Sequence, residues 1–358
     1  NKEEFINAVD IVAKEKNISK DLIFEAMELA LASAYKKNFD SKTNVRVNIN
    51  RDTGEIKVFK VLYVVDEISE EDEEAYSKIL VPDAEKIVAG IKAGETIEEE
   101  VTPKDFGRVA AATAKQVVTQ KIREAERNSI MSEFEGKQDE LLVGLVSRED
   151  AQNYYIDLGR AHGILSKKEL IPGEKIEMGS SIKVYVTKIE DTGKSPLILL
   201  SRTHYGFVKR LLELEIPELQ EGIVKLYSVA RDAGSRSKVA VYSDNPKVDA
   251  IGACIGERSS RINRIMKELG GEKLDIVLYD KDPAIFIKNA LSPAKEVNVI
   301  VTDPKNNIAL AVAEGEQLSL AIGKKGQNVR LAARLTKYRI DVKTKEELKE
   351  SGINISFE

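Results

Sequence analysis

The chain has 358 residues, with 55 Lys and Arg against 60 Asp and Glu, a formal net charge of −5, and 42% hydrophobic residues. This balance excludes a disordered polyelectrolyte, and the length predicts roughly two to four folded domains. One cysteine, Cys254, and two histidines, His162 and His204, exclude disulfide frameworks and zinc sites that need several such ligands. No stretch suits a membrane span and no secretion signal is present, so we expect a cytoplasmic protein without cofactor or metal. The sequence lacks an initiating Met, and we expect that its start is trimmed.

Charge is spread unevenly along the chain. Residues 1–135 hold 20 basic and 28 acidic residues, a net charge of −8, whereas residues 203–340 hold 22 basic and 17 acidic residues, a net charge of +5. The acidic N-terminal part is suited to bind a basic protein surface, and the basic C-terminal part is suited to bind a polyanion. Ordinary solvated faces would give the same mild imbalance, so charge alone does not decide the function.

The first hundred residues indicate helices followed by a hairpin. Apolar residues at helical spacing predict helices over residues 2–16 and 20–38. Alternation over residues 45–49 and 56–64, on either side of the turn at Asp52, Thr53 and Gly54, predicts a β-hairpin.

A single long helix is predicted next. Pro103 suits the first turn of a helix that continues to about Phe134, and Gly136 ends it. At 1.5 Å per residue such a helix is roughly 45 Å long, which suits the joining of domains.

Residues 136–202 are typical of a small β-barrel. Short alternating segments occur at Leu141–Val146, Tyr154–Leu158, Gly163–Leu165, Ile182–Ile189 and Leu197–Leu200. Five such strands in this length predict an OB-type barrel. Ile156 and Leu158 would face inward, leaving Tyr155 exposed as a platform for an RNA base or as a cover for the barrel's end.

The strongest signal is an internal duplication over residues 223–343. Two strands, a short helix, a glycine-containing loop, a second helix and a third strand occur twice in the same order. Gly256 of the first copy and Gly323 of the second lie at the same place in this order. A repeat of an entire element order indicates two related domains side by side in the chain.

The loop Gly323-Lys324-Lys325-Gly326 is suited to hold a nucleic-acid backbone. Its glycines permit close approach of the main chain, and the helix that follows points free amide groups at the same anion. Lys324 and Lys325 add positive charge. This is the G-x-x-G arrangement of KH domains, which bind about four nucleotides of unpaired RNA.

With these motifs the chain resembles the NusA family of bacterial transcription factors over nearly all its length. The resemblance is carried by Tyr155–Ala161 in the barrel, Val248–Gly256 in the first repeat and Leu320–Ala332 in the second. It implies a multidomain α+β protein: an N-terminal α/β domain with a long connecting helix, an OB-type barrel and two tandem KH domains of the type with strands before helices. The expected boundaries are 1–135, with the helix from about 103, then 136–202, 203–283, 284–345 and a tail at 346–358.

The resemblance also implies a function without catalysis. Residues 1–135 would dock on RNA polymerase, while the barrel and the KH domains hold nascent single-stranded RNA and so modulate pausing, intrinsic termination and antitermination. Other antitermination factors are expected partners, and the chain is expected to be a monomer that contacts no membrane. The expected RNA-binding residues are Gly323, Lys324, Lys325, Gly326, Gln327, Asn328, Arg330, Gly256, Arg258, Ser259, Arg261, Arg264, Tyr155 and Arg160.

The first KH loop departs from the motif. It reads Gly256-Glu257-Arg258-Ser259, with serine in place of the second glycine and a carboxylate where phosphate would lie. Ser259 is predicted to cap the following helix through its hydroxyl group. We therefore predict that the second loop binds RNA more tightly and that Arg258, Arg261 and Arg264 supply much of the first domain's attraction.

The sequence lacks the motifs of nucleotide-binding enzymes, and two other RNA-related functions remain as alternatives. There is no P-loop and no dinucleotide-binding glycine motif, which disfavours nucleotide hydrolysis and dinucleotide binding. An RNA-degrading phosphorylase also carries KH and OB modules, but its KH domain precedes the barrel and it needs two large catalytic domains. An RNA chaperone without polymerase contact is the other alternative.

Overall fold

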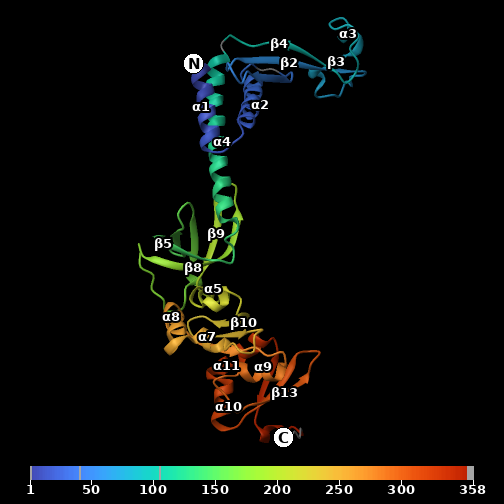
Figure 1. The fold of residues 1–358 in the computed structure, drawn as a ribbon. Coiled ribbons are helices and arrows are strands. Elements are labelled where there is room, and N and C mark those ends of the chain that lie inside the picture. The colour runs from blue at the N-terminus through green and yellow to red at the C-terminus, as the bar shows by residue number, and fades with distance from the viewer. Residues whose placement is uncertain (1, 40–41, 105, 353–358) are drawn as a thin grey trace. The chain divides into compact units, whose positions relative to one another are not determined.

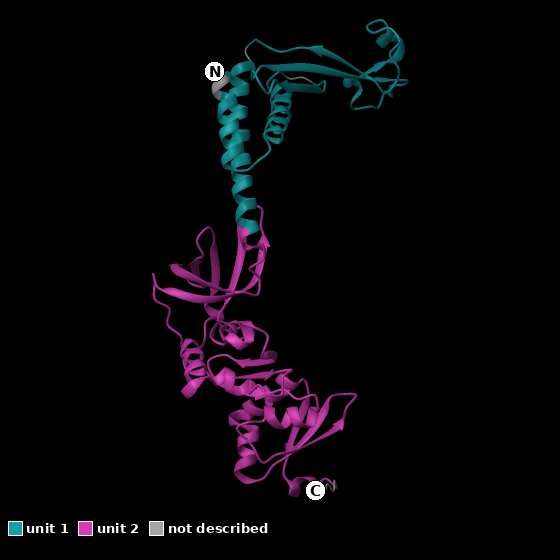
Figure 2. Cartoon of the chain, viewed as in Figure 1, with its two compact units in different colours: residues 1–132 teal, residues 133–358 magenta. Residues whose placement is uncertain are grey.

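The chain divides into two compact units, residues 1–132 and 133–358 (Figure 2). The structure, a computed structural model, describes residues 2–39, 42–104 and 106–352. Of the predicted tail at 346–358, residues 353–358 lie outside the described residues, and the short helix α12 (Lys345–Glu350) covers its beginning.

The first unit joins two helices to a four-stranded sheet. Helices α1 (Lys2–Glu15) and α2 (Lys20–Asn38) and the hairpin of β1 (Val45–Ile49) and β2 (Ile56–Val65) form as predicted. Beyond the hairpin, the sequence pattern had predicted no elements before Pro103. The structure has η1 (Ala75–Ser77), β3 (Lys78–Leu80), α3 (Val81–Glu85) and β4 (Thr96–Glu100), with β3 parallel and β4 antiparallel to β2.

The core of the first unit lies between its helices and the hairpin. Val9 of α1, Phe24 and Leu31 of α2 and Val58 of β2 are fully buried there, and Phe106 completes the cluster. Each large apolar side chain removed from water contributes about 1.5–3 kcal/mol, so the amphipathic stripes of the helices account for this arrangement.

The long helix α4 (Phe106–Glu135) contains 30 residues (Figure 1). Its predicted start at Pro103 is three residues too early. The Val101 amide donates to the Val58 carbonyl and the Thr102 hydroxyl accepts from the Val58 amide, so the chain is still paired with β2 at that point.

The second unit begins with a closed five-stranded barrel, as predicted. Its strands are β5 (Leu141–Glu149), β6 (Asn153–Asp157), β7 (His162–Ser166), β8 (Ser181–Asp191) and β9 (Pro196–Ser201), in the spatial order β5-β6-β7-β9-β8. Ile156, Leu165 and Ile198 fill its interior. At Gly163 a Cβ would lie 2.4 Å from the Leu200 side chain, so glycine allows the strands to pack this closely.

Two three-stranded units of identical topology follow the barrel. The first has β10 (Lys225–Asp232), β11 (Arg236–Tyr242), α7 (Ala250–Ile255), η3 (Glu257–Ser259), α8 (Ser260–Glu268) and β12 (Lys273–Leu278). The second has β13 (Asn298–Asp303), β14 (Ile308–Val312), α10 (Gly315–Ile322), η4 (Lys324–Gly326), α11 (Gln327–Thr336) and β15 (Arg339–Lys343). In both, the first two strands are antiparallel and the last is parallel to the second, which confirms two KH units with strands before helices.

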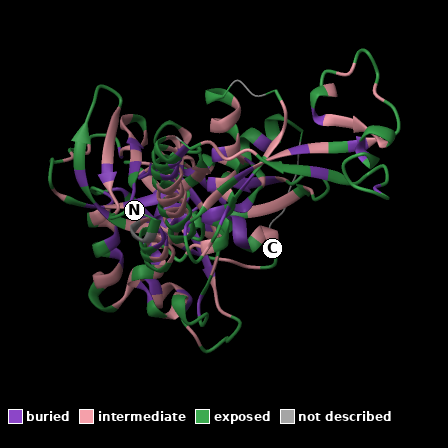
Figure 3. Ribbon diagram, turned by 90° about the horizontal axis from the view of Figure 1, so that it is seen from above, coloured by how far each residue is buried: buried purple, intermediate pink, exposed green. Residues whose placement is uncertain are grey.

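Helices that the sequence pattern had not indicated connect these parts. α5 (Tyr205–Glu215) and α6 (Pro217–Gln220) precede the first KH unit, and α9 (Pro283–Ala290) precedes the second. Tyr185 of the barrel shares one core with α5 and the first KH unit, and Phe286 of α9 joins a second core that spans both KH units. Buried residues concentrate on the strands and helices, while most connecting loops are exposed (Figure 3).

Candidate nucleic-acid interface

The second KH loop, Gly323–Gly326, has a backbone that only glycine adopts easily at its first position. Gly323 has φ 76° and ψ 173°, and a Cβ there would lie 2.7 Å from the Cβ and 2.8 Å from the backbone nitrogen of Asn328. Lys325 and Gly326 follow in the left-handed region, at φ 55° and φ 75°. These turns leave the main chain of the loop close to the surface at the start of α11.

The two lysines of this loop are available to a ligand. Lys324 and Lys325 are exposed, and neither side chain makes a hydrogen bond or an ion pair with any residue that the structure describes. The Arg330 guanidinium donates to the Lys325 carbonyl and so supports the loop from α11. An exposed pair of ammonium groups beside a helix N-terminus is suited to bind phosphate.

Two predicted RNA contacts in α11 serve the protein's own packing. The Gln327 amide donates to Asp232 Oδ2 and to Ser235 Oγ, both at 2.7 Å, and so ties the second loop to the first KH unit. The Asn328 amide is 4% exposed and donates to the Leu291 and Ala321 carbonyls at 3.0 Å. The Asn328 side chain is therefore turned away from the surface on which an RNA strand would lie.

The first KH loop, Gly256–Ser259, repeats the backbone of the second. Gly256 has φ 76° and ψ 173°, and Arg258 and Ser259 are left-handed at φ 54° and φ 62°. The prediction that Ser259 caps α8 through its hydroxyl is wrong, because its side chain makes no capping hydrogen bond. A serine cap needs extended backbone at that residue, and Ser259 is left-handed instead.

The arginines near the first loop differ in whether the protein already provides a partner for their guanidinium groups. Arg258 is exposed and its guanidinium has no partner among the described residues. The Arg261 guanidinium is 2.6 Å from Glu218 Oε2 and 2.7 Å from the Ala253 carbonyl, and that of Arg264 is 3.5 Å from Glu215 Oε2. Arg261 thus holds α7, α8 and α6 together, which leaves Arg258 as the free cation of this loop.

A groove of about 390 Å³ lies beside the second loop, at the junction of the two KH units. Gly323 and Lys324 line it from the second unit, and Ser235, Arg236 and Lys273 line it from the first. The Arg236 guanidinium is held by Asp275 at 2.8 Å. Arg236 and Lys273 cannot be recognised as site residues from the sequence, since only the packing of one KH unit on the other brings them beside the Gly-Lys-Lys-Gly loop.

The barrel residues lie apart from this groove. Tyr155 is half-buried instead of exposed, because the Arg148 guanidinium lies 4.0 Å from its ring centre. Its hydroxyl donates to Asp150 Oδ2 at 2.7 Å, a hydrogen bond that lowers the pKa of that carboxyl group. Arg160 is exposed and lies 3.2 Å from Glu133 Oε2. One face of the Tyr155 ring is therefore already covered by a cation.

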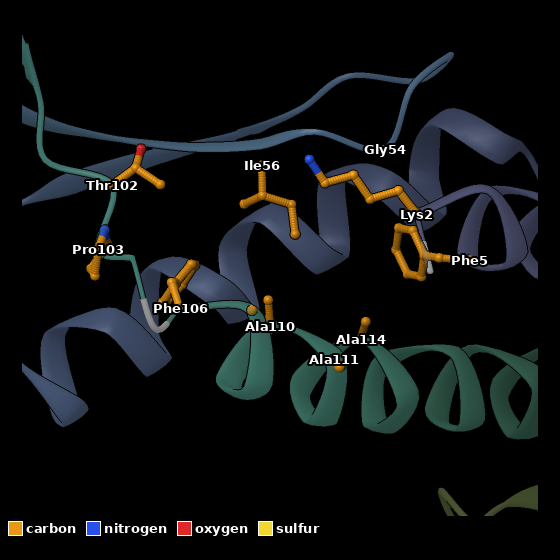
Figure 4. Close-up of a pocket in the computed structure, with 11 residues that line it drawn as sticks. Lys2, Phe5, Gly54, Ile56, Thr102, Pro103, Phe106, Ala110, Ala111 and Ala114 are labelled. Atoms are coloured by element: carbon orange, nitrogen blue, oxygen red, sulfur yellow. The ribbon is translucent and has the colours of Figure 1, made fainter.

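The first unit has an apolar pocket of about 360 Å³ (Figure 4). Phe5 of α1, Ile56 of β2 and Phe106 and Ala110 of α4 point into it. Of the described residues that line this pocket, only Lys2 and Thr102 have polar side chains. Such a lining does not suit a phosphate, so the candidate RNA contacts are those of the second unit.

Two further features were sought among the described residues, a cluster of metal-ligating side chains and a helix able to span a membrane. Within residues 2–39, 42–104 and 106–352, no group of three or more His, Cys, Asp or Glu side chains is placed to hold a metal ion. Across the same ranges, no helix combines the length and the apolar character that crossing a membrane requires.

Comparison with known proteins gives consistent matches along the chain. Residues 4–128 match the NusA N-terminal domain, residues 202–279 the NusA-like first KH domain and residues 283–350 the NusA-like second KH domain. The chain is 49% identical over 350 residues to the transcription termination/antitermination protein NusA of Bacillus subtilis, covering 98% of this chain and 93% of that protein. It is 47% identical over 350 residues to the NusA of Halalkalibacterium halodurans, with coverage of 98% and 90%. The solution structure of the N-terminal domain of B. subtilis NusA is 52% identical, covers 36% of this chain and 99% of that one, and has a TM-score of 0.30.

Proposed function

Because the chain belongs to the NusA family of transcription termination/antitermination proteins, we propose that it is an RNA-binding transcription elongation factor. It docks on RNA polymerase, holds nascent single-stranded RNA and thereby modulates pausing, intrinsic termination and antitermination. The observation that carries this proposal is the pair of KH loops with the same backbone geometry in one compact unit.

The second KH loop is the main RNA contact in this proposal. Gly323 and Gly326 bring the main chain to the RNA backbone, and Lys324 and Lys325 bind its phosphates. Lys273 continues the positive surface along the groove at the junction of the KH units, while Arg236 is paired there with Asp275. The phosphate contacts hold a strand without reading its sequence.

The first KH loop and the barrel make weaker contacts. Gly256, Ser259 and the free guanidinium of Arg258 receive the strand, while Arg261 and Arg264 act through their ion pairs with α6 and α5. Gln327, Asn328 and Arg330 maintain the second loop's shape. Tyr155 and Arg160 extend the RNA contact onto the barrel.

The first unit provides the polymerase contact. Residues 1–135 have a net charge of −8, which suits a basic protein surface and repels the RNA held elsewhere. With this function we propose domains that end at residues 135, 202, 283 and 345. We further propose that the protein is a cytoplasmic monomer, that it works with other antitermination factors, and that it catalyses no reaction of its own.

The experiment that tests this proposal is transcription through an intrinsic terminator with purified RNA polymerase. The wild-type chain is expected to change pausing and the fraction of terminated transcripts, and to be recovered with polymerase in a pull-down. Lys324→Asp with Lys325→Asp should keep the polymerase contact and lose most of the RNA-dependent effect. Recovery of no polymerase would favour an RNA chaperone, and phosphate-dependent release of nucleoside diphosphates would reveal a phosphorylase.

A further inference from the structure

Three aromatic rings stack in a column where the barrel meets the first KH unit. The ring centres of Tyr185 and His204 are 4.9 Å apart with an interplanar angle of 14°, and those of His204 and Tyr205 are 4.4 Å apart at 29°. Tyr185 is buried, whereas Tyr205 is 55% exposed. The column therefore begins in the core and ends in an aromatic ring at the surface.

The protein holds this column in place before any ligand arrives. The His204 Nδ1 accepts from the Gly206 amide at 2.9 Å, and the Tyr185 hydroxyl donates to Asp139 Oδ1 at 2.9 Å. At Gly206 a Cβ would lie 2.3 Å from the Tyr185 ring, so glycine is required for this packing. A ring that is already ordered loses little conformational freedom when a further ring stacks on it.

A free cation accompanies the exposed ring. Lys209 lies four residues after Tyr205 in α5, and residues at this spacing lie on the same side of a helix. The Lys209 ammonium makes no hydrogen bond or ion pair within the part of the chain that the structure describes. The two carboxylates near the column, Asp139 and Glu169, accept hydrogen bonds from neighbouring hydroxyl groups. These hydroxyl donors are neutral, so both carboxylates stay anionic, and Lys209 supplies a cation on the side of α5 that carries Tyr205.

The column lies between the parts of the second unit that are proposed to hold RNA. Helix α5 packs against β5 and β8 of the barrel and against β10 and α8 of the first KH unit (Figure 1). Tyr205 is the first residue of this helix, which bridges the barrel and the first KH unit.

We propose that Tyr205 and Lys209 form a stacking site for one unpaired nucleobase of single-stranded RNA. The base lies on the exposed face of Tyr205 and extends the column, while Lys209 contacts a neighbouring phosphate. Every base offers a flat aromatic face, so this site contributes affinity without sequence preference. The inference rests on the proposed RNA-binding function, and the free ammonium beside the ring favours RNA over a protein partner.

The absence of tryptophan from the chain allows a direct test. In the full chain, Tyr205→Trp places a single tryptophan at the end of the column, and stacking with a base quenches indole fluorescence. We expect quenching on saturation with an unstructured oligoadenylate. Tyr76→Trp is the matched control, because Tyr76 is 60% exposed and lies in the first unit. Its fluorescence should stay unchanged.

Affinity measurements on further variants separate stacking from apolar contact. Tyr205→Leu should weaken oligoadenylate binding about 5- to 150-fold, the equivalent of roughly 1–3 kcal/mol per stacked base, whereas Tyr205→Phe should keep the wild-type affinity. Lys209→Ala should reduce the slope of log K against log salt by about 0.7, the value of one phosphate contact on a single strand.

Specific outcomes would overturn the proposal. Unchanged Tyr205→Trp fluorescence at saturating RNA, or wild-type affinity of Tyr205→Leu, excludes the stacking site while RNA binding by the chain remains established. Reduced polymerase recovery by Tyr205→Leu with unchanged RNA affinity would assign the ring to a protein contact instead. If the wild-type chain binds no RNA at all, the proposed function itself fails, which is a distinguishable result.

Discussion

Ser259 of the first KH loop and Gly326 of the second occupy the same left-handed backbone position, at φ 62°, ψ 22° and φ 75°, ψ 12°. The residues before them, Arg258 and Lys325, also match, at φ 54°, ψ 35° and φ 55°, ψ 27°. A left-handed conformation costs a residue with a side chain roughly 1–2 kcal/mol, a cost that glycine does not have. The first loop therefore keeps the KH geometry at the expense of strain.

Relief of this strain is expected to stabilise the second unit. Ser259→Gly removes the left-handed cost, but glycine also raises the entropy of the unfolded chain by roughly 0.4–1 kcal/mol. The net gain in the free energy of unfolding should be about 0–1.6 kcal/mol. Denaturant titration of the full chain measures it.

The control for this variant is the neighbouring serine. Ser260 has φ −62° and ψ −41°, so Ser260→Gly has no strain to relieve and should lower stability. Equal destabilisation by the two variants would show that Ser259 is not strained.

The two glycines of the second loop should respond differently to alanine. Gly323→Ala forces a Cβ to within 2.8 Å of the Asn328 backbone nitrogen in a conformation nearly restricted to glycine. At Gly326 the backbone is left-handed, and the Cβ of an alanine there would approach only the flexible Arg330 guanidinium, at 3.2 Å. We expect Gly323→Ala to reduce the RNA affinity and the free energy of unfolding several-fold more than Gly326→Ala does. RNA titration measures the first quantity and denaturation measures the second. Similar effects of the two would contradict the loop geometry.

The sequence pattern predicts the order of the domains but not the contacts that their packing creates. The repeated order of strands, helices and glycines predicted both KH units, and the short alternating segments of residues 136–202 predicted the barrel, since local periodicity encodes both. The intramolecular partners of Arg261 and Gln327 were not predictable. Glu218 and Asp232 are distant from them in sequence and contact them only in the folded chain. The strand β4 was missed because it ends in three consecutive glutamates, Glu98, Glu99 and Glu100, which break any alternating apolar pattern.

The lysines of the second loop should dominate the salt dependence of RNA binding. If about four phosphates are neutralised, the slope of log K against log salt is near −3, using roughly −0.7 per phosphate of a single strand. Lys324→Ala with Lys325→Ala removes two of these contacts and should bring the slope to about −1.4. Equilibrium titrations at several salt concentrations measure it.

A matched pair of lysines gives the control for this slope. Lys295 and Lys305 are exposed in the same KH unit and lie outside the groove, so their replacement by alanine should leave the slope unchanged. If Lys324→Asp with Lys325→Asp binds RNA normally while Arg258→Ala with Arg261→Ala does not bind, the first loop is the stronger contact.

Stability of the second unit should fall below neutral pH because of His204. Its Nδ1 caps α5 by accepting from the Gly206 amide, which requires an unprotonated ring nitrogen. Burial lowers the pKa of His204 below its ordinary value of 6.5. Above pH 6.5 the ring is neutral in both states and its stabilisation is complete. As the pH falls below 6.5, only the unfolded chain takes up the proton, so stability decreases until the lower folded-state pKa is reached.

Replacement of each histidine identifies the source of this pH dependence. His204→Asn keeps a side chain that caps helices but does not titrate, so the free energy of unfolding should no longer decrease as the pH falls below 6.5. Loss of the stacked ring lowers stability at every pH alike, which leaves the slope as the diagnostic quantity. His162, the other histidine, is exposed, and His162→Asn should retain the wild-type slope because its ring makes no capping hydrogen bond among the described residues. A slope that survives in His204→Asn and vanishes in His162→Asn would show that the α5 cap does not control it.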